Sequence, residues 1–163
     1  MLRVQLHKNT GKNVILKCIR QDNSITWSKL HPNTEYHDLA HMVIEEVLLF
    51  KNSFFGMISN GINISDFELP EHQKPEALKG NNLPKESLVT EHLVNLLMIE
   101  HFNATSYIDF LNQAQHILTE NKLPFPTVLT EEKLATIRKE YKLLINSWHA
   151  IENGKHLEKT FEL

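Results

Sequence analysis

Two histidines four residues apart, His37 and His41, are the residues in this sequence whose spacing most suggests chemistry. On an α-helix, residues i and i+4 lie about 40° apart on one face, so both imidazoles can chelate one transition metal. Glu45 continues the same row and is a candidate third ligand. The sequence therefore predicts a metal site of His37, His41 and Glu45, with a divalent transition metal such as Zn²⁺ as its cofactor.

Asp38 is the candidate catalytic residue, because it directly follows the first histidine of the pair. In zinc hydrolases of the His-Glu-x-x-His type, a glutamate at that place acts as general base. Aspartate is one methylene shorter, so the sequence departs from that pattern. Two alternatives stay open: metal-free acid–base chemistry by His37 with Asp38 or Glu45, and a purely structural role for histidines at the edge of the core.

The helix expected over residues 35–50 must also form part of the core. On a helical wheel with His37 at 0°, the apolar residues fill an arc running from roughly 200° through to 20°. His37 falls at the edge of that arc, whereas His41 and Glu45, at about 40° and 80°, turn away from it. We therefore expect His37 to be half-buried and the other two to face solvent. Met42 and Leu49 fall on the polar side and suggest a homodimer contact.

The order of the elements predicts an α+β fold: an antiparallel sheet of three N-terminal strands and a C-terminal strand, packed with four or five helices. We expect one domain over 1–163. Its parts are a strand meander at 1–30, a helical part at 35–152 with a polar loop at 70–84, and a terminal strand at 155–163.

Composition excludes several classes of function. A net charge of −3 gives no basic surplus for nucleic acid, and no apolar run is long enough to span a membrane. With five glycines and one cysteine, the chain lacks phosphate-binding loops, a G-x-S-x-G elbow and a C-x-x-C pair. The absence of a catalytic motif favours a non-enzymatic binding or interaction module. The alternative is a metal-dependent, hydrolase-like enzyme that uses the His-x-x-x-His helix.

Three parts of the chain resemble a group of small uncharacterised bacterial proteins. The matching segments are Pro32 with His37-Asp38-Leu39-Ala40-His41, then Phe54-Phe55-Gly56 with Gly61, and then Trp148, Gly154 and Leu157. The group has a strand-rich start, an HDL-x-H helix, a G-F-F/W-G segment and a terminal strand, although Ser53 replaces its first glycine here. The group has no known activity, so the resemblance implies only a bacterial, cytoplasmic protein.

Overall fold

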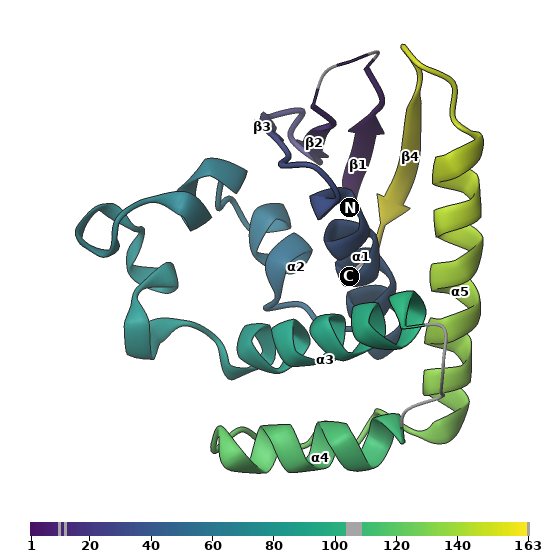
Figure 1. The fold of residues 1–163 in the computed structure, drawn as a ribbon. Coiled ribbons are helices and arrows are strands. Elements are labelled where there is room, and N and C mark those ends of the chain that lie inside the picture. The colour runs from purple at the N-terminus through teal and green to yellow at the C-terminus, as the bar shows by residue number, and fades with distance from the viewer. Residues whose placement is uncertain (10, 12, 104–108, 163) are drawn as a thin grey trace.

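Four strands form one antiparallel sheet in the order β3-β2-β1-β4 (Figure 1). The computed structural model describes residues 1–9, 11, 13–103 and 109–162. Its strands are β1 (Leu2–His7), β2 (Ile15–Arg20), β3 (Ile25–Lys29) and β4 (His156–Phe161). The first three strands make the predicted meander, and the C-terminal strand pairs with β1. The predicted sheet is therefore confirmed.

The sheet presents its apolar side chains to one face, because neighbouring residues of a strand point to opposite faces. Leu2, Val4 and Leu6 of β1 are buried, and Leu6 lies opposite Leu16 of β2 and Leu157 of β4. Cys18 shares this buried face, as expected for a small apolar side chain in a central strand.

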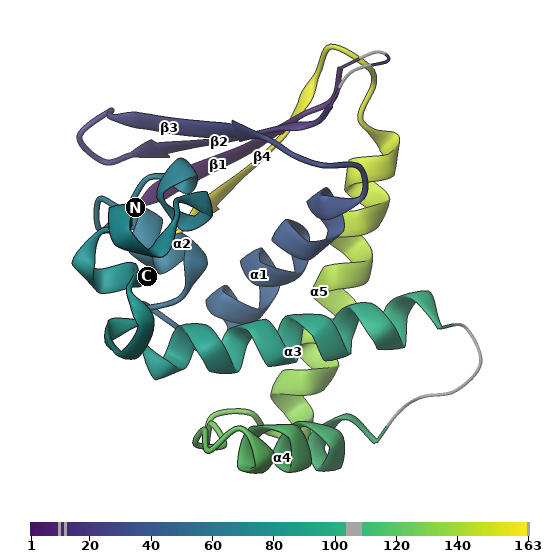
Figure 2. The same cartoon turned by 60° about the vertical axis from the view of Figure 1, so that its left-hand side comes forward.

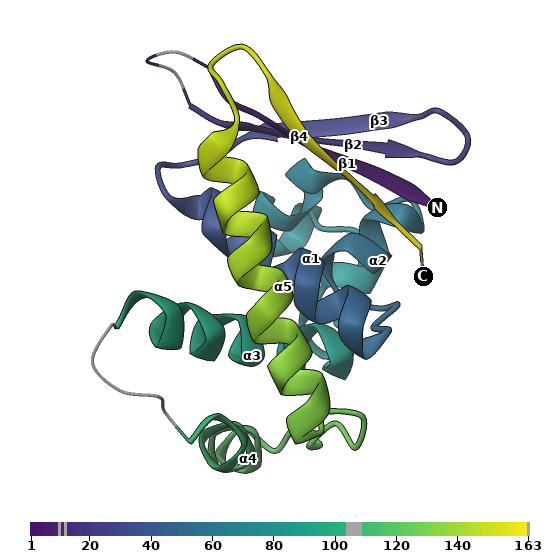
Figure 3. The same cartoon turned by 90° about the vertical axis from the view of Figure 1, so that its right-hand side faces the viewer.

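Five α-helices are present in the described ranges, and all of them lie on this apolar face of the sheet (Figures 2 and 3). They are α1 (Thr34–Leu48), α2 (Phe54–Ser59), α3 (Lys85–Phe102), α4 (Phe110–Glu120) and α5 (Glu131–Ala150). The predicted α+β class and number of helices are confirmed. None of the helices in these ranges is both long and apolar enough to cross a membrane.

Helix α1 is the centre of the helical layer. It lies between the sheet and α3, with α5 along one side and α2 close to its C-terminal end (Figures 2 and 3). Packing from several sides buries ten of the fifteen residues of α1 and leaves none of them fully exposed. Met42 is among the buried residues, with an exposed fraction of 1%. The expectation that Met42 faces solvent is therefore wrong, whereas Leu49 is exposed at 65%.

The chain leaves α1 through a tight turn that places α2 beside it. Leu49 adopts a left-handed conformation with φ of 58°, and its N–H closes the helix on the carbonyls of Glu45 and Glu46. The segment then runs to α2, where Gly56 approaches the backbone of Lys51. A Cβ on Gly56 would lie 2.2 Å from the carbonyl oxygen of Lys51, so only glycine fits there.

The polar stretch 70–84 forms three short 3₁₀ turns on the surface: Glu71–Gln73, Glu76–Leu78 and Gly80–Asn82. Leu78 is the one buried residue among these turns and anchors the stretch to the rest of the protein.

Candidate metal centre

Helices α1 and α3 bring three metal-binding side chains together. Nε2 of His41 lies 3.2 Å from Oε1 of Glu91, and Nε2 of His37 lies 3.3 Å from the second carboxylate oxygen, Oε2. The imidazole centroids of the two histidines are 4.7 Å apart. One ligand atom from each of the three residues lies within 4.8 Å of the others. Two imidazoles and one carboxylate are a ligand set that suits Zn²⁺ and other divalent transition metals.

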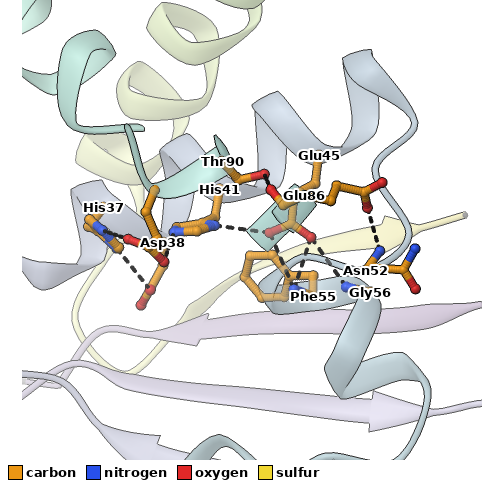
Figure 4. Close-up of polar contacts among 10 residues, drawn as sticks. His37, Asp38, His41, Glu45, Asn52, Phe55, Gly56, Glu86 and Thr90 are labelled. Atoms are coloured by element: carbon orange, nitrogen blue, oxygen red, sulfur yellow. Dashed lines mark hydrogen bonds and ion pairs between the residues drawn. The ribbon is translucent and has the colours of Figure 1, made fainter. Parts of the chain in front are cut away.

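A second carboxylate supports His41 from behind. Nδ1 of His41 lies 3.0 Å from Oε1 of Glu45, one turn further along α1 (Figure 4). With that carboxylate as its acceptor, Nδ1 carries the proton and Nε2 is left as the nitrogen that faces Glu91. His41 Nε2 is buried and lacks an aligned hydrogen-bond partner within the described ranges, although Glu91 is close. A metal ligand needs a nitrogen presented in this way.

Backbone groups of α2 hold Glu45 in place. The N–H groups of Phe55 and Gly56 donate to Oε2 of Glu45 at 3.0 and 3.2 Å (Figure 4). These N–H groups belong to the first turn of a helix and have no acceptor within it, so a carboxylate satisfies them. The close approach of Gly56 to Lys51 sets the position of α2 and thereby the direction of both donors.

His37 has a similar but looser arrangement. Its Nδ1 lies 4.0 Å from Oδ1 of Asp38, so each histidine has one carboxylate near Nδ1 and Glu91 near Nε2. Asp38 is 5% exposed, and its second oxygen, Oδ2, has no hydrogen-bond partner in the part of the chain that the structure describes. Asp38 is thus a buried carboxyl group at the edge of the cluster.

The charges of the site are tightly coupled. Burial alone would lower the pKa of His41, but the carboxylates of Glu45 and Glu91 outweigh it and raise that pKa to about 10. Burial acts in the opposite sense on Glu91, yet His37 and His41 hold its pKa well below the usual range. Burial raises the pKa of both Asp38 and Glu45. A metal that binds here would displace protons from the imidazoles, because histidine ligates in its neutral form.

The site opens to solvent on the side of His37 and Glu91. Their side chains are 30% and 44% exposed, whereas that of His41 is 1% exposed. Phe54 covers the His41 ring with 5.5 Å between centroids, and Phe67 lies 4.9 Å beyond Phe54. Both phenylalanines are only partly buried. Phe54 and Phe67 therefore form a partly accessible aromatic surface beside His41.

Of the four residues singled out in the sequence, two face the cluster of ligand atoms and two lie beside or behind the histidines. His37 and His41 face Glu91, whereas the carboxylate of Glu45 lies on the Nδ1 side of His41 and Asp38 lies beside His37. The expectation that His41 and Glu45 face solvent is wrong, because they are 1% and 0% exposed, whereas His37 is half-buried as expected, with 30% of its side chain exposed. Packing of α3 and α2 against this side of α1 explains the burial of His41 and Glu45.

Sequence reasoning missed Glu91, which is the residue that joins the two histidines. It lies on α3, far along the chain from the histidine pair, and no spacing rule links it to them. Glu91 shares a helix face with Ser87 and Val94, whose burial only the structure shows, so the sequence alone carried no signal for it.

A separate open hollow of about 310 Å³ is lined by residues that include Arg20, Asp22 and Asn60. The guanidinium of Arg20 donates to the carbonyl oxygens of Ile58 at 2.6 Å and Ile62 at 2.7 Å. These bonds tie β2 to the last turn of α2 and to the segment that follows it, so Arg20 stabilises the fold there.

No protein-family model matches the chain, and comparison with curated proteins and with solved structures likewise finds no match. The resemblance to the bacterial HDL-x-H group therefore stays a prediction. The geometry around His37, His41 and Glu91 is the feature of the molecule that points to a function.

Proposed function

We propose that the protein binds one divalent transition metal through His37, His41 and Glu91 and acts as a metal-dependent, hydrolase-like enzyme. The observation that carries the proposal is the convergence of three ligand atoms within 4.8 Å of one another. Glu45 and Asp38 strengthen it, because a carboxylate behind a metal-binding imidazole fixes its tautomer and raises its basicity. In this reading Glu45, which the sequence suggested as a ligand, is a positioning residue.

Three protein ligands leave room for further ligands, as catalytic zinc sites do. A metal held in this way would lower the pKa of a water molecule and polarise a carbonyl group. The chain's own contributions are the orientation of His41 by Glu45 and the exclusion of water from His41 by Phe54. The partly exposed side of His37 and Glu91 is where a substrate would enter.

Metal titration tests the proposal. Chelator-treated protein titrated with Zn²⁺ in a calorimeter should bind one ion per chain, and His37→Ala and Glu91→Gln should each weaken binding by at least about tenfold. His116→Ala is the matched control, because His116 and Glu120 form an exposed i, i+4 pair of the same type on α4. Circular dichroism would confirm that the variants fold. If the two site variants bind Zn²⁺ as tightly as the His116 control, the proposal is wrong.

We further propose that the protein works in the bacterial cytoplasm. The proposal follows from the resemblance and is supported by the single cysteine, Cys18, a buried thiol that suits a reducing compartment. Immunodetection in fractions of the source cells would test it, and recovery outside the cytoplasmic fraction would contradict it.

A further inference from the structure

We infer that the metal site accepts neutral ligands that carry an aromatic or other apolar group and discriminates against phosphate and its esters. The inference rests on the proposed metal binding and adds the class of ligand. Two independent features carry it: the charge around His37, His41 and Glu91, and the aromatic side chains beside them.

The charge around the cluster is acidic. Glu91, Glu45 and Asp38 contribute three carboxyl groups, and the groups that face them are His37 and His41. Both histidines become neutral when they ligate a metal. A divalent ion would then be surrounded by three acidic side chains. A phosphate dianion would thus enter a site with no surplus of positive charge.

The three carboxyl groups are also not paired with the cationic donors that usually bind phosphate. Within the described ranges, each recorded ion pair of the three carboxyl groups is with a histidine, and none is with lysine or arginine. The N-terminus of α2 lies beside Glu45, and its Phe55 and Gly56 N–H groups already donate to that carboxylate. Neither a guanidinium fork among these recorded ion pairs nor a free N–H group of Phe55 or Gly56 is therefore available to bind phosphate.

The aromatic side chains explain why the site should prefer ligands that carry an aromatic or other apolar group. Phe54 contacts the His41 ring and Phe67 continues the surface, and both keep part of their area accessible. A planar apolar group on a ligand bound at the metal could pack against Phe54 and lose contact with water. Burial of an aromatic group of this kind should give roughly a tenfold gain in affinity.

Four probes on Co²⁺-loaded protein test the inference: imidazole, 4-phenylimidazole, inorganic phosphate and phenyl phosphate, all at pH 8. The readouts are the visible absorption of the Co²⁺ ion and calorimetry. We expect 4-phenylimidazole to bind at least about tenfold more tightly than imidazole. Phosphate and phenyl phosphate should neither shift the spectrum nor compete. Phe54→Ala should abolish most of the preference for 4-phenylimidazole over imidazole, whereas Phe102→Ala, at an exposed aromatic residue at the end of α3, should leave that preference unchanged.

The outcomes separate this inference from the proposed function. If the protein takes up one Co²⁺ but phosphate or phenyl phosphate binds as tightly as 4-phenylimidazole, the ligand class is wrong and metal binding stands. The same holds if the phenyl preference is missing or survives Phe54→Ala. If no Co²⁺ is bound, both the proposed function and this inference are overturned.

Discussion

Nδ1 of His41 lies 3.0 Å from Oε1 of Glu45, and both side chains are almost wholly buried. The two residues are one helical turn apart on α1, yet neither faces solvent. Glu45 also accepts the N–H groups of Phe55 and Gly56 from α2, and His41 faces Glu91 from α3. One histidine–glutamate pair thus links three helices and orients the candidate metal ligand.

Glu45→Gln should reduce affinity for Zn²⁺ by about 10- to 100-fold, although Glu45 does not face the cluster of ligand atoms. Glu45 uses one oxygen for His41 and the other for the backbone of Phe55 and Gly56. The introduced amide has one acceptor and one donor, so it cannot serve both partners. We also expect a loss of about 1–3 kcal/mol in the free energy of unfolding. Calorimetric titration and chemical denaturation measure the two effects.

Glu120→Gln provides the matched control for this change. Glu120 lies 3.3 Å from His116 at the same i, i+4 spacing, but both side chains are more than half exposed. Affinity for Zn²⁺ and stability should therefore stay at the wild-type values. Equal Zn²⁺ affinities in the Glu45 and Glu120 variants would show that Glu45 does not position His41.

Gly56→Ala should destabilise the protein by about 3 kcal/mol or more, because the new methyl group would overlap the carbonyl of Lys51 at 2.2 Å. Backbone cannot move aside as a flexible side chain can, so α2 would have to shift. Gly11→Ala is the comparison: it has φ of 61° but nothing within 4 Å of the added Cβ, and should cost only about 1–2 kcal/mol. Thermal denaturation of both variants compares their losses of stability, and a smaller loss for Gly56→Ala than for Gly11→Ala would contradict the prediction.

Leu49→Gly should stabilise the protein by about 1 kcal/mol. Leu49 ends α1 with φ of 58°, a conformation that glycine adopts without steric cost, and it is 65% exposed. Leu143→Gly is the same substitution at a position that is 50% exposed within α5, where it should destabilise by about 1 kcal/mol. Urea denaturation of the two variants should show changes in the free energy of unfolding that have opposite signs. Destabilisation by both would show that Leu49 contributes contacts that outweigh its strain.

The sheet and most helices were predictable because their signals are local. Alternating apolar residues and short turns place the three N-terminal strands, and a terminal strand with Leu157 and Phe161 facing inward has to pair with a neighbour. Asn103 or Thr105 also predicts the start of a helix that runs to about Asn121, whereas α4 begins at Phe110 and residues 104–108 lie outside the described ranges.

The candidate site was only half predictable. The spacing of His37 and His41 is a property of one helix, whereas Glu91 arrives from α3 through tertiary packing. The helical wheel assumed that α1 has one buried face, and it therefore placed His41 and Glu45 toward solvent. A helix surrounded by a sheet and three other helices has hardly any exposed face, and its buried polar residues must find partners among themselves.

Stability of the chelator-treated protein should fall between pH 6.5 and 8.5 because of His41. Its pKa is about 6.5 in an unfolded chain and is raised to about 10 in the fold, after the carboxylates of Glu45 and Glu91 outweigh burial. The folded state therefore holds this proton more tightly, so the stabilisation is complete below pH 6.5 and is lost as the pH rises toward 10. His41→Gln removes the effect, and Glu91→Gln, which removes one of the two carboxylates that raise the pKa of His41, is the second variant should the first not fold. Thermal denaturation should show a decrease in wild type that exceeds the variant's by about 5 °C. Parallel pH profiles would mean that His41 is not held as the cation.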